Sequence, residues 1–107
     1  IMGNAGSFFK NPIVTKEKYE QLCQNYDFKS YPINEEFCKL SAAQLITKCG
    51  WKGKRCGEVG VHQNQALVLV NYGNATGYDV LNLAKKIQKD VWEQLNVQIE
   101  MEINVIQ

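Results

Sequence analysis

The sequence lacks an apolar run long enough to span a membrane, and it lacks an excess of charge of either sign. Lysine and arginine together number 12, and aspartate and glutamate number 11, so the formal net charge is +1. A surface for nucleic acid or for anionic lipids needs clustered positive charge. We therefore expect neither nucleic acid nor a membrane among the partners of this chain.

Histidine is nearly absent, and the cysteines lack the spacing of a metal site. His62 is the only histidine, and the four cysteines include no C-x-x-C pair. We therefore expect no zinc site and interpret His62 as a structural residue. Cys23 and Cys49 lie on the apolar faces of predicted helices, so both are expected to be buried as small hydrophobic side chains. Free cysteines fit a reducing cytoplasm, while their even number leaves a disulfide-bonded secreted fragment open.

The chain begins at Ile1, without an initiator methionine or a charged leader. We therefore expect a piece of a longer protein, with no signal peptide. Its 107 residues suit a single domain. Its hydrophobic content of 45% is sufficient for a folded core.

Helical periodicity predicts two helices in the first half of the chain. Thr15 and Ser41 are suited to cap them, and Gly50 stands where a left-handed C-terminal residue belongs. The apolar positions that repeat at helical spacing are Tyr19, Leu22, Cys23 and Tyr26 in the first helix and Ala42, Leu45, Ile46 and Cys49 in the second. The other predicted segments are a short strand or extended stretch over 8–14 and loops over 27–36 and 51–57.

The second half predicts a hairpin, a long helix and a final strand. These elements cover residues 59–61 and 66–70 for the hairpin, 78–95 for the helix and 97–105 for the strand. The second hairpin strand is continuously apolar, which indicates burial on both faces. Thr76 and Asp79 match a capping-box variant, an interpretation that we prefer to a glycosylation site at Asn74. We therefore predict a single α+β domain, in which about three helices pack on a small, largely antiparallel sheet.

The most unusual stretch opens the chain, as Gly3-Asn4-Ala5-Gly6-Ser7-Phe8-Phe9-Lys10-Asn11-Pro12. Glycine permits left-handed backbone and close approach of a ligand. Such a loop can present Ser7, together with backbone N–H groups, to an oxyanion or a phosphate. The residues alone also allow a tight turn that enters a strand, with Ser7 as an ordinary turn residue.

This stretch resembles the segment that carries the catalytic serine in the UDP-N-acetylenolpyruvylglucosamine reductase family. The resemblance covers essentially the whole chain, because further landmarks of the family follow in order. They lie at residues 30–32, 39–43, 50–53 and 61–71 and in the final predicted strand. The resemblance implies that residues 1–107 are the C-terminal, substrate-binding domain of the reductase, with the FAD-binding domains upstream and outside this chain.

The resemblance also implies an activity. In this bacterial cytoplasmic family, FAD reduced by NADPH passes hydride to UDP-N-acetylglucosamine enolpyruvate, which yields UDP-N-acetylmuramate for peptidoglycan. Ser7 matches the serine that protonates the adjacent carbon, and Glu102 matches a glutamate that handles the charge of the substrate carboxylate. Met101 replaces the proline of the family pattern, so Glu100, on the same face of the predicted strand, stays an alternative to Glu102. The fragment alone is expected to be inactive.

Four polar residues match substrate-binding positions of the family. They are Asn11, Tyr31, Lys52 and Gln65. A lysine charge and a phenol donor suit phosphate oxygens, and an amide suits a sugar hydroxyl. The ordinary alternative for each is an exposed polar side chain. For the whole chain, the alternative is a non-catalytic module that binds nucleotide sugars or regulates through them.

Overall fold

Two antiparallel sheets and three helices make up the part of the chain that the structure describes. The structure is a computed structural model that describes residues 3–102, with residues 3–7 described by their backbone alone. In chain order, the elements are β1 (Gly3–Ser7), β2 (Ile13–Thr15), α1 (Lys16–Cys23), β3 (Ser30–Pro32), β4 (Phe37–Leu40), α2 (Ala42–Lys48), β5 (Arg55–Cys56), β6 (Val59–Val61), β7 (Val68–Asn71) and α3 (Gly77–Leu95).

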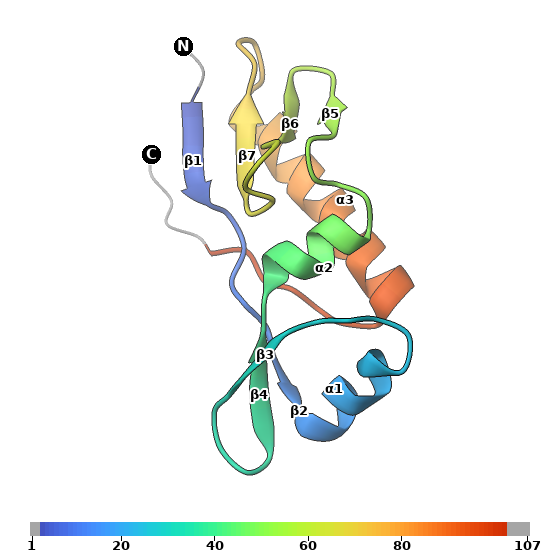
Figure 1. Cartoon of the computed structure of the whole chain (residues 1–107). Helices are drawn as coiled ribbons and strands as arrows, with labels where there is room; N and C mark the ends of the chain where they lie inside the picture. Colours follow the sequence, from blue (N-terminus) through green and yellow to red (C-terminus); the bar gives the residue numbers. More distant parts are fainter. Residues whose placement is uncertain (1–2, 103–107) are drawn as a thin grey trace.

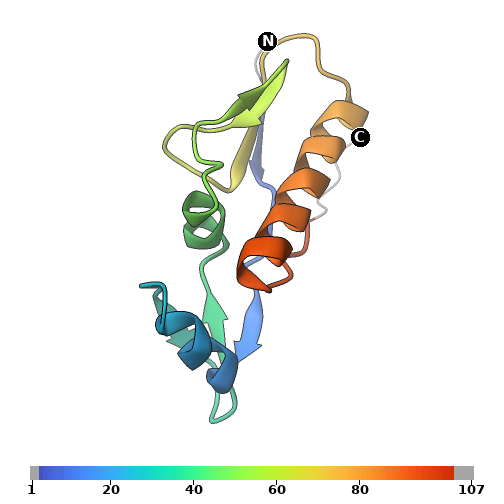
Figure 2. The same cartoon turned by 90° about the vertical axis from the view of Figure 1, so that its right-hand side faces the viewer.

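The sheets lie toward opposite ends of an elongated molecule of 45 × 26 × 21 Å, with α2 between them (Figure 1). One sheet has the strand order β1-β7-β6-β5 and the other has the order β2-β4-β3, with every described pairing antiparallel. α3 runs along the long axis beside the four-stranded sheet (Figure 2). The predicted α+β class, antiparallel pairing and three helices are confirmed within residues 3–102. The strands form two sheets because the chain crosses from one to the other between Ser7 and Ile13.

The glycine-rich opening stretch is a strand, so the loop predicted there is wrong. β1 pairs with β7, and Ser7 lies opposite Val68. The register shifts between Asn4 and Ser7, which marks a bulge or a similar irregularity. Gly6 lies in this interval and accommodates a bend at low steric cost. The stretch is extended because β7 offers it a free edge on which to pair.

The predicted caps of the first two helices are confirmed. The Thr15 hydroxyl accepts a hydrogen bond from the Lys18 N–H at 3.1 Å. The Ser41 hydroxyl accepts one from the Gln44 N–H at 3.3 Å. Each bond satisfies a donor that the first helical turn leaves without a partner. Gly50 adopts a φ of 90°, as predicted for the left-handed residue after α2.

The burial predicted for the cysteines is wrong for Cys23 and only partly right for Cys49. Cys23 is exposed and Cys49 is half-buried. α1 ends at Cys23, so Tyr26 lies beyond the helix rather than on it, and Leu22 is the one buried residue of α1. Both helices are short, and a cysteine at the end of a short helix is not covered by the core.

Two regions that were predicted to be loops contain strands. β3 lies within residues 27–36 and pairs with β4, and β5 lies within residues 51–57 and pairs with β6. These strands have three and two residues, which is too short for a period of two to be visible. Pro32 is tolerated in β3 because β3 is an edge strand.

The predicted hairpin of β6 and β7 is confirmed, and Val68–Val70 are buried on both faces of β7. Gly60 in β6 has a steric role. A Cβ at this position would lie 3.0 Å from Arg55 Cα and 3.0 Å from the Lys54 carbonyl oxygen. β5 therefore approaches β6 so closely that any side chain at position 60 would have to push β5 aside.

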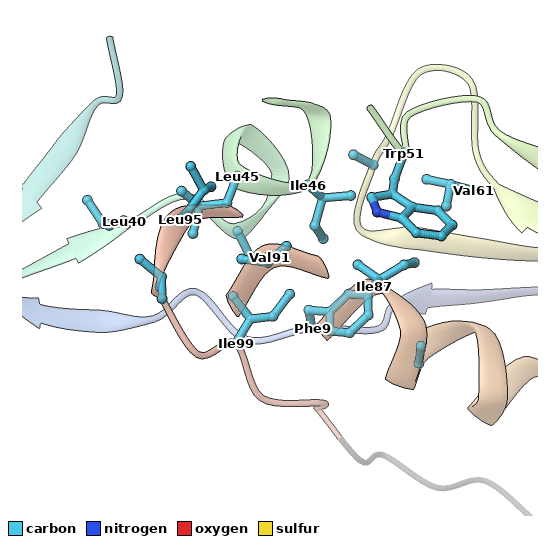
Figure 3. Close-up of a cluster of buried hydrophobic side chains, with 14 of the residues drawn as sticks. Phe9, Leu40, Leu45, Ile46, Trp51, Val61, Ile87, Val91, Leu95 and Ile99 are labelled. Carbon is cyan, nitrogen blue, oxygen red and sulfur yellow. The ribbon is translucent and has the colours of Figure 1, made fainter. Parts of the chain in front are cut away.

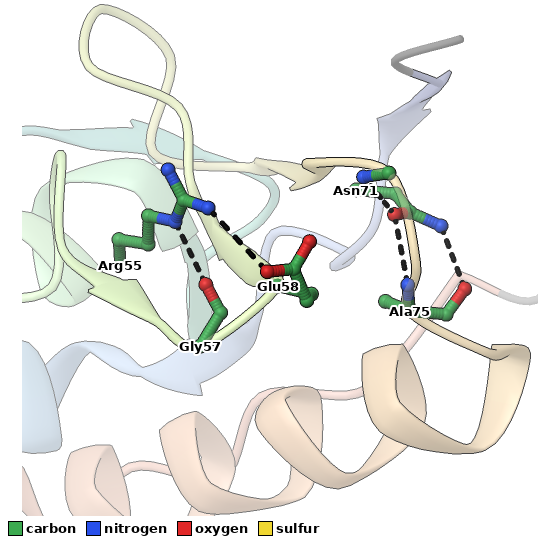
Figure 4. A network of polar contacts seen from close by, with 6 residues as sticks. Arg55, Gly57, Glu58, Asn71 and Ala75 are labelled. Carbon is green, nitrogen blue, oxygen red and sulfur yellow. Dashed lines mark hydrogen bonds and ion pairs between the residues drawn. The ribbon is translucent and has the colours of Figure 1, made fainter.

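The turn between β7 and α3 is held by Asn71 (Figure 4). The Asn71 Oδ1 accepts hydrogen bonds from the N–H groups of Gly73 and Ala75, and its Nδ2 donates to the Ala75 carbonyl. The predicted capping box then begins α3. The Thr76 hydroxyl accepts from the Asp79 N–H at 3.1 Å, and the Asp79 carboxylate accepts from the Thr76 N–H at 2.9 Å.

The final predicted strand is, in its described part, an extended segment with one bridge, which joins Met101 to Phe9. The predicted alternation of burial is confirmed, since Val97 and Ile99 are buried whereas Gln98 and Glu100 are exposed. No longer ladder forms within residues 97–102, because the partner stretch turns away toward β2 after Lys10. Residues 103–105 of the predicted strand lie outside the described residues.

The core joins both ends of the molecule. It draws on the segment between β1 and β2, on α2, on α3 and on the C-terminal segment (Figure 3). Phe9 is 1% exposed, and Ile46, Ile87 and Ile99 are fully buried. The stretch that carries Phe9 directly follows Ser7, so the core fixes the position of the end of β1.

Candidate functional site

Ser7, the predicted proton donor, is the last residue of β1. Its Cα lies opposite Val68, and the N–H of the next residue, Phe8, donates to the Leu67 carbonyl at 2.8 Å. Phe9 follows and is anchored in the core. The backbone around Ser7 is therefore held by β7 on one side and by the core on the other.

Glu102, the predicted second catalytic residue, is brought to the same place. The Glu102 N–H donates to the Phe8 carbonyl at 2.8 Å, directly beside Ser7. The Glu102 side chain is exposed. The alternative, Glu100, accepts at its carbonyl from the Lys10 N–H at 2.8 Å, so its backbone lies farther along the stretch from Ser7. One backbone hydrogen bond, from Glu102 to Phe8, thus brings the C-terminal segment beside Ser7.

A groove of about 990 Å³ lies between α2 and the turn that precedes β7. Lys52 and Gln65, two of the predicted substrate-binding residues, line it together. Leu67 and Val68, at the start of β7, line it as well, and their backbone pairs with that of Phe8 and Ser7. The groove has the size of a pocket for a small molecule, although it is open to solvent.

Five polar residues of the groove were not found from the sequence, among them Asp27 and Thr47. Gln44 and Lys48 of α2 and Asn64 of the turn line it. Gln44 also accepts, at its side-chain oxygen, a hydrogen bond from the Lys29 N–H at 2.9 Å. No sequence signal pointed to Lys48, because Lys52 lies beyond the end of α2 and the two lysines share no helix face.

Asn11 lies in the segment between β1 and β2, and its side chain reaches the start of α2. Its Oδ1 accepts a hydrogen bond from the Ala42 N–H at 2.9 Å, so Asn11 satisfies a donor of the first helical turn that Ser41 does not reach. This bond occupies the amide oxygen and leaves the amide nitrogen to serve as a donor. The side chain is exposed.

Tyr31 lies in β3, in the other sheet, opposite Lys39 of β4. It is 56% exposed, and among the described residues it is not part of the groove lining. The structure therefore brings Ser7 and Glu102 together and places Lys52 with Gln65. It leaves Tyr31 on a separate surface.

Three basic residues lie close together in the sequence, Lys52, Lys54 and Arg55, and the fold separates their side chains. Lys52 lines the groove, whereas the Lys54 Nζ lies 4.7 Å from the centroid of the Trp51 ring. The Arg55 guanidinium lies 3.9 Å from the centroid of the Tyr72 ring, and its Nε donates to the Gly57 carbonyl at 2.7 Å (Figure 4). Lys54 and Arg55 are thus engaged within the structure.

His62 and Cys49 have structural surroundings. The His62 Nδ1 accepts a hydrogen bond from the Asn64 N–H at 3.0 Å, which supports the turn before β7. Burial raises the pKa of the Cys49 thiol to about 11, with a smaller contribution from the negative charge of Asp90. A thiol with a raised pKa is a poor nucleophile at neutral pH.

Comparison with known proteins places the chain in a family. Residues 2–106 match the model of the UDP-N-acetylenolpyruvoylglucosamine reductase C-terminal domain. The chain belongs to this family. A reductase of this name from Flavobacterium johnsoniae is 53% identical over 106 residues, which cover 98% of this chain and 32% of the relative. Its counterparts from Pseudomonas savastanoi pv. phaseolicola and Bdellovibrio bacteriovorus are 49% and 50% identical and cover 98% and 95% of this chain.

The extent of these matches agrees with a C-terminal reductase domain. The chain spans about a third of the length of the curated relatives that it matches, 32% in the first case and 31% in the second. Within residues 3–102, none of the helices is both long and apolar enough to cross a membrane. The same described residues contain no group of three or more acidic, histidine or cysteine side chains that is arranged to hold a metal ion.

Proposed function

We propose that this chain is the substrate-binding domain of an NADPH-dependent flavoprotein reductase. The reductase converts UDP-N-acetylglucosamine enolpyruvate to UDP-N-acetylmuramate, a step of peptidoglycan synthesis in the bacterial cytoplasm. The membership of the chain in the reductase family supports this proposal. The observation that carries the assignment of the residues is the 2.8 Å bond between Phe8 O and Glu102 N, which joins the neighbourhoods of Ser7 and Glu102.

Ser7 is proposed to donate the proton. Hydride added to one carbon of the enolpyruvyl double bond leaves negative charge on the adjacent carbon and its carboxylate. A serine hydroxyl is a weak acid, so it gives up its proton only to a strongly basic carbon held beside it. The two-sided anchoring of the backbone at Ser7, by β7 and by the Phe9 side chain in the core, suits a group that must be held in one position.

Glu102 is proposed to act on the same part of the substrate. The Glu102 backbone bonds to Phe8, the neighbour of Ser7, whereas the Glu100 backbone bonds to Lys10, three residues from Ser7. A carboxyl group beside the substrate carboxylate is placed to handle the charge that develops there when hydride is added.

The groove is proposed to receive the nucleotide diphosphate and the sugar. The Lys52 ammonium suits the phosphate oxygens, and the Gln65 amide suits a sugar hydroxyl. Asn11, which does not line the groove, is proposed to offer its amide N–H donor from beside the start of α2. Tyr31, which does not line the groove in this structure, is proposed to reach the nucleotide from the edge of the other sheet.

FAD is assigned to the upstream part of the full-length reductase. The N–H groups at the start of a long helix are a common site for a dinucleotide phosphate, and in α3 the Thr76–Asp79 capping box uses two of them. No residue of this chain is assigned to the cofactor. When bound upstream, FAD supplies the hydride that NADPH provides.

The full-length reductase with this chain as its C-terminal domain tests the proposal. We expect NADPH oxidation to depend on UDP-N-acetylglucosamine enolpyruvate and the product to have the mass of UDP-N-acetylmuramate. The alternative, a non-catalytic module of the same fold, predicts binding of the nucleotide sugar without NADPH oxidation. That second result would refute the proposed activity.

A further inference from the structure

The groove contains a second lysine, to which the family resemblance did not point. Lys48, in the last turn of α2, lines the same groove as Lys52 and Gln65. Both lysines are exposed, and each carries one formal positive charge. The groove therefore presents two positive charges where one was expected from the sequence.

The position of Lys48 is restrained. Its Nζ lies 5.7 Å from the centroid of the Tyr26 ring, a distance at which the ring attracts the ammonium. Tyr26 itself is half-buried and its N–H donates to the Leu22 carbonyl at 2.9 Å. A restrained lysine loses less side-chain freedom when it binds a ligand than a free one does.

The charge of the groove suits a ligand with more than one negative charge. Lys48 and Lys52 carry two positive charges, and Asp27, which also lines the groove, carries one negative charge. A diphosphate has two charged phosphate groups, and lysine binds each as a point charge. Asp27 would oppose such a ligand by repulsion, so the two lysines together are needed to make the groove attractive to it.

We propose that Lys48 binds the diphosphate of the nucleotide substrate together with Lys52. This inference rests on the proposed function, since it takes the nucleotide sugar as the ligand of the groove. Lys48 contributes to the affinity for substrate and takes no part in proton transfer.

The test uses the full-length reductase with Lys48→Gln and, as a matched control, Lys54→Gln. Lys54 is also exposed and also lies over an aromatic ring, but it is not part of the groove lining. We expect Lys48→Gln to raise the KM for the enolpyruvyl substrate about threefold to tenfold with kcat unchanged, because a partly solvated charge contact is lost. The effect should shrink at high ionic strength. Lys54→Gln should leave KM unchanged.

Two further measurements separate the possible outcomes. Asp27→Asn should lower the KM, because it removes the repulsive charge from the groove. Inorganic pyrophosphate, tested as a bound anion on the same proteins, should bind more weakly to Lys48→Gln than to Lys54→Gln. If the two lysine variants match each other in both KM and pyrophosphate affinity, the inference is wrong. If pyrophosphate binding depends on Lys48 but the wild type does not turn over the substrate, the anion contact stands and the proposed reaction fails.

Discussion

Asn11 offers a test that separates a structural role from a role in binding. Its Oδ1 accepts from the Ala42 N–H at 2.9 Å, and Ala42 is fully buried. Asn11→Ala leaves this N–H without its acceptor, which costs about 1–2 kcal/mol, the lower part of the usual range because Asn11 itself is exposed to water. In a domain of this size, that loss lowers Tm by roughly 5–10 °C.

Asn11→Asp is the matched variant. A carboxylate oxygen can accept the same hydrogen bond, and a negative charge at a helix N-terminus is favourable, so stability should be retained. The variant lacks the amide N–H donor and repels phosphate. We therefore expect its KM for the nucleotide substrate to rise, although its unfolding midpoint stays close to that of the wild type.

Two assays give the answer for Asn11. Urea denaturation followed by far-UV circular dichroism measures stability, and steady-state kinetics of the full-length reductase measures KM. If Asn11→Ala unfolds at the same urea concentration as the wild type, the hydrogen bond to Ala42 contributes nothing measurable. If Asn11→Asp binds substrate as tightly as the wild type, Asn11 is a helix cap and not a substrate contact.

Three further predictions concern stability and the cysteine thiol. Ile87→Ala should lower the free energy of unfolding by about 2–5 kcal/mol in urea denaturation, because the side chain is fully buried, whereas Lys86→Ala at its exposed neighbour should change it by less than about 0.5 kcal/mol. Gly60→Ala should lower the Tm in a thermal scan, because its Cβ would lie 3.0 Å from Arg55 Cα; an unchanged Tm would show that β5 moves aside without cost. Alkylation of Cys49, followed by peptide mass spectrometry, should rise toward a midpoint near pH 11 rather than near 9.0, the ordinary pKa of a thiol, because burial disfavours the thiolate. The unfolded thiol loses its proton before the folded one, so stability should fall as pH rises from 9 to 11; a midpoint near 9 would contradict the burial.

The parts of the fold that were predictable from the sequence have signals that are local and repeated. α3 has a stripe of apolar residues over many turns and a capping box at its start, and both are present in the structure. Ser41 and Gly50 likewise bracket α2, because capping and positive φ depend on the residue at one position. Such features do not depend on distant partners.

The segments whose secondary structure was predicted wrongly are those whose structure depends on a distant partner in the sequence. β3 and β5 are too short to carry a pattern, and they are strands only because β4 and β6 lie beside them. The stretch ending at Ser7 looks like a loop by its glycines, but it is extended because β7 offers a free edge. Residues 97–102 alternate like a strand, yet their partner turns away after Lys10, and a single bridge remains.

The candidate site shows the same division. The family resemblance pointed to Ser7, Glu102, Lys52 and Gln65. In the structure, the backbone of Glu102 lies beside Ser7, and Lys52 and Gln65 line the same groove. The sequence did not point to Lys48, because an exposed lysine in the last turn of a short helix has no distinguishing pattern. Only the packing of α2 beside the turn before β7 brings it to the groove.

The central claim is that Ser7 protonates the substrate in a flavin-dependent reduction. Stopped-flow measurement of both half-reactions in full-length Ser7→Ala tests it most directly, with Ser30→Ala as a control that makes the same change in the other sheet. We predict that NADPH bleaches the flavin at the wild-type rate in both variants. Reoxidation by the enolpyruvyl substrate should slow by about a hundredfold to ten-thousandfold in Ser7→Ala alone. Reoxidation at the wild-type rate in Ser7→Ala would contradict the account.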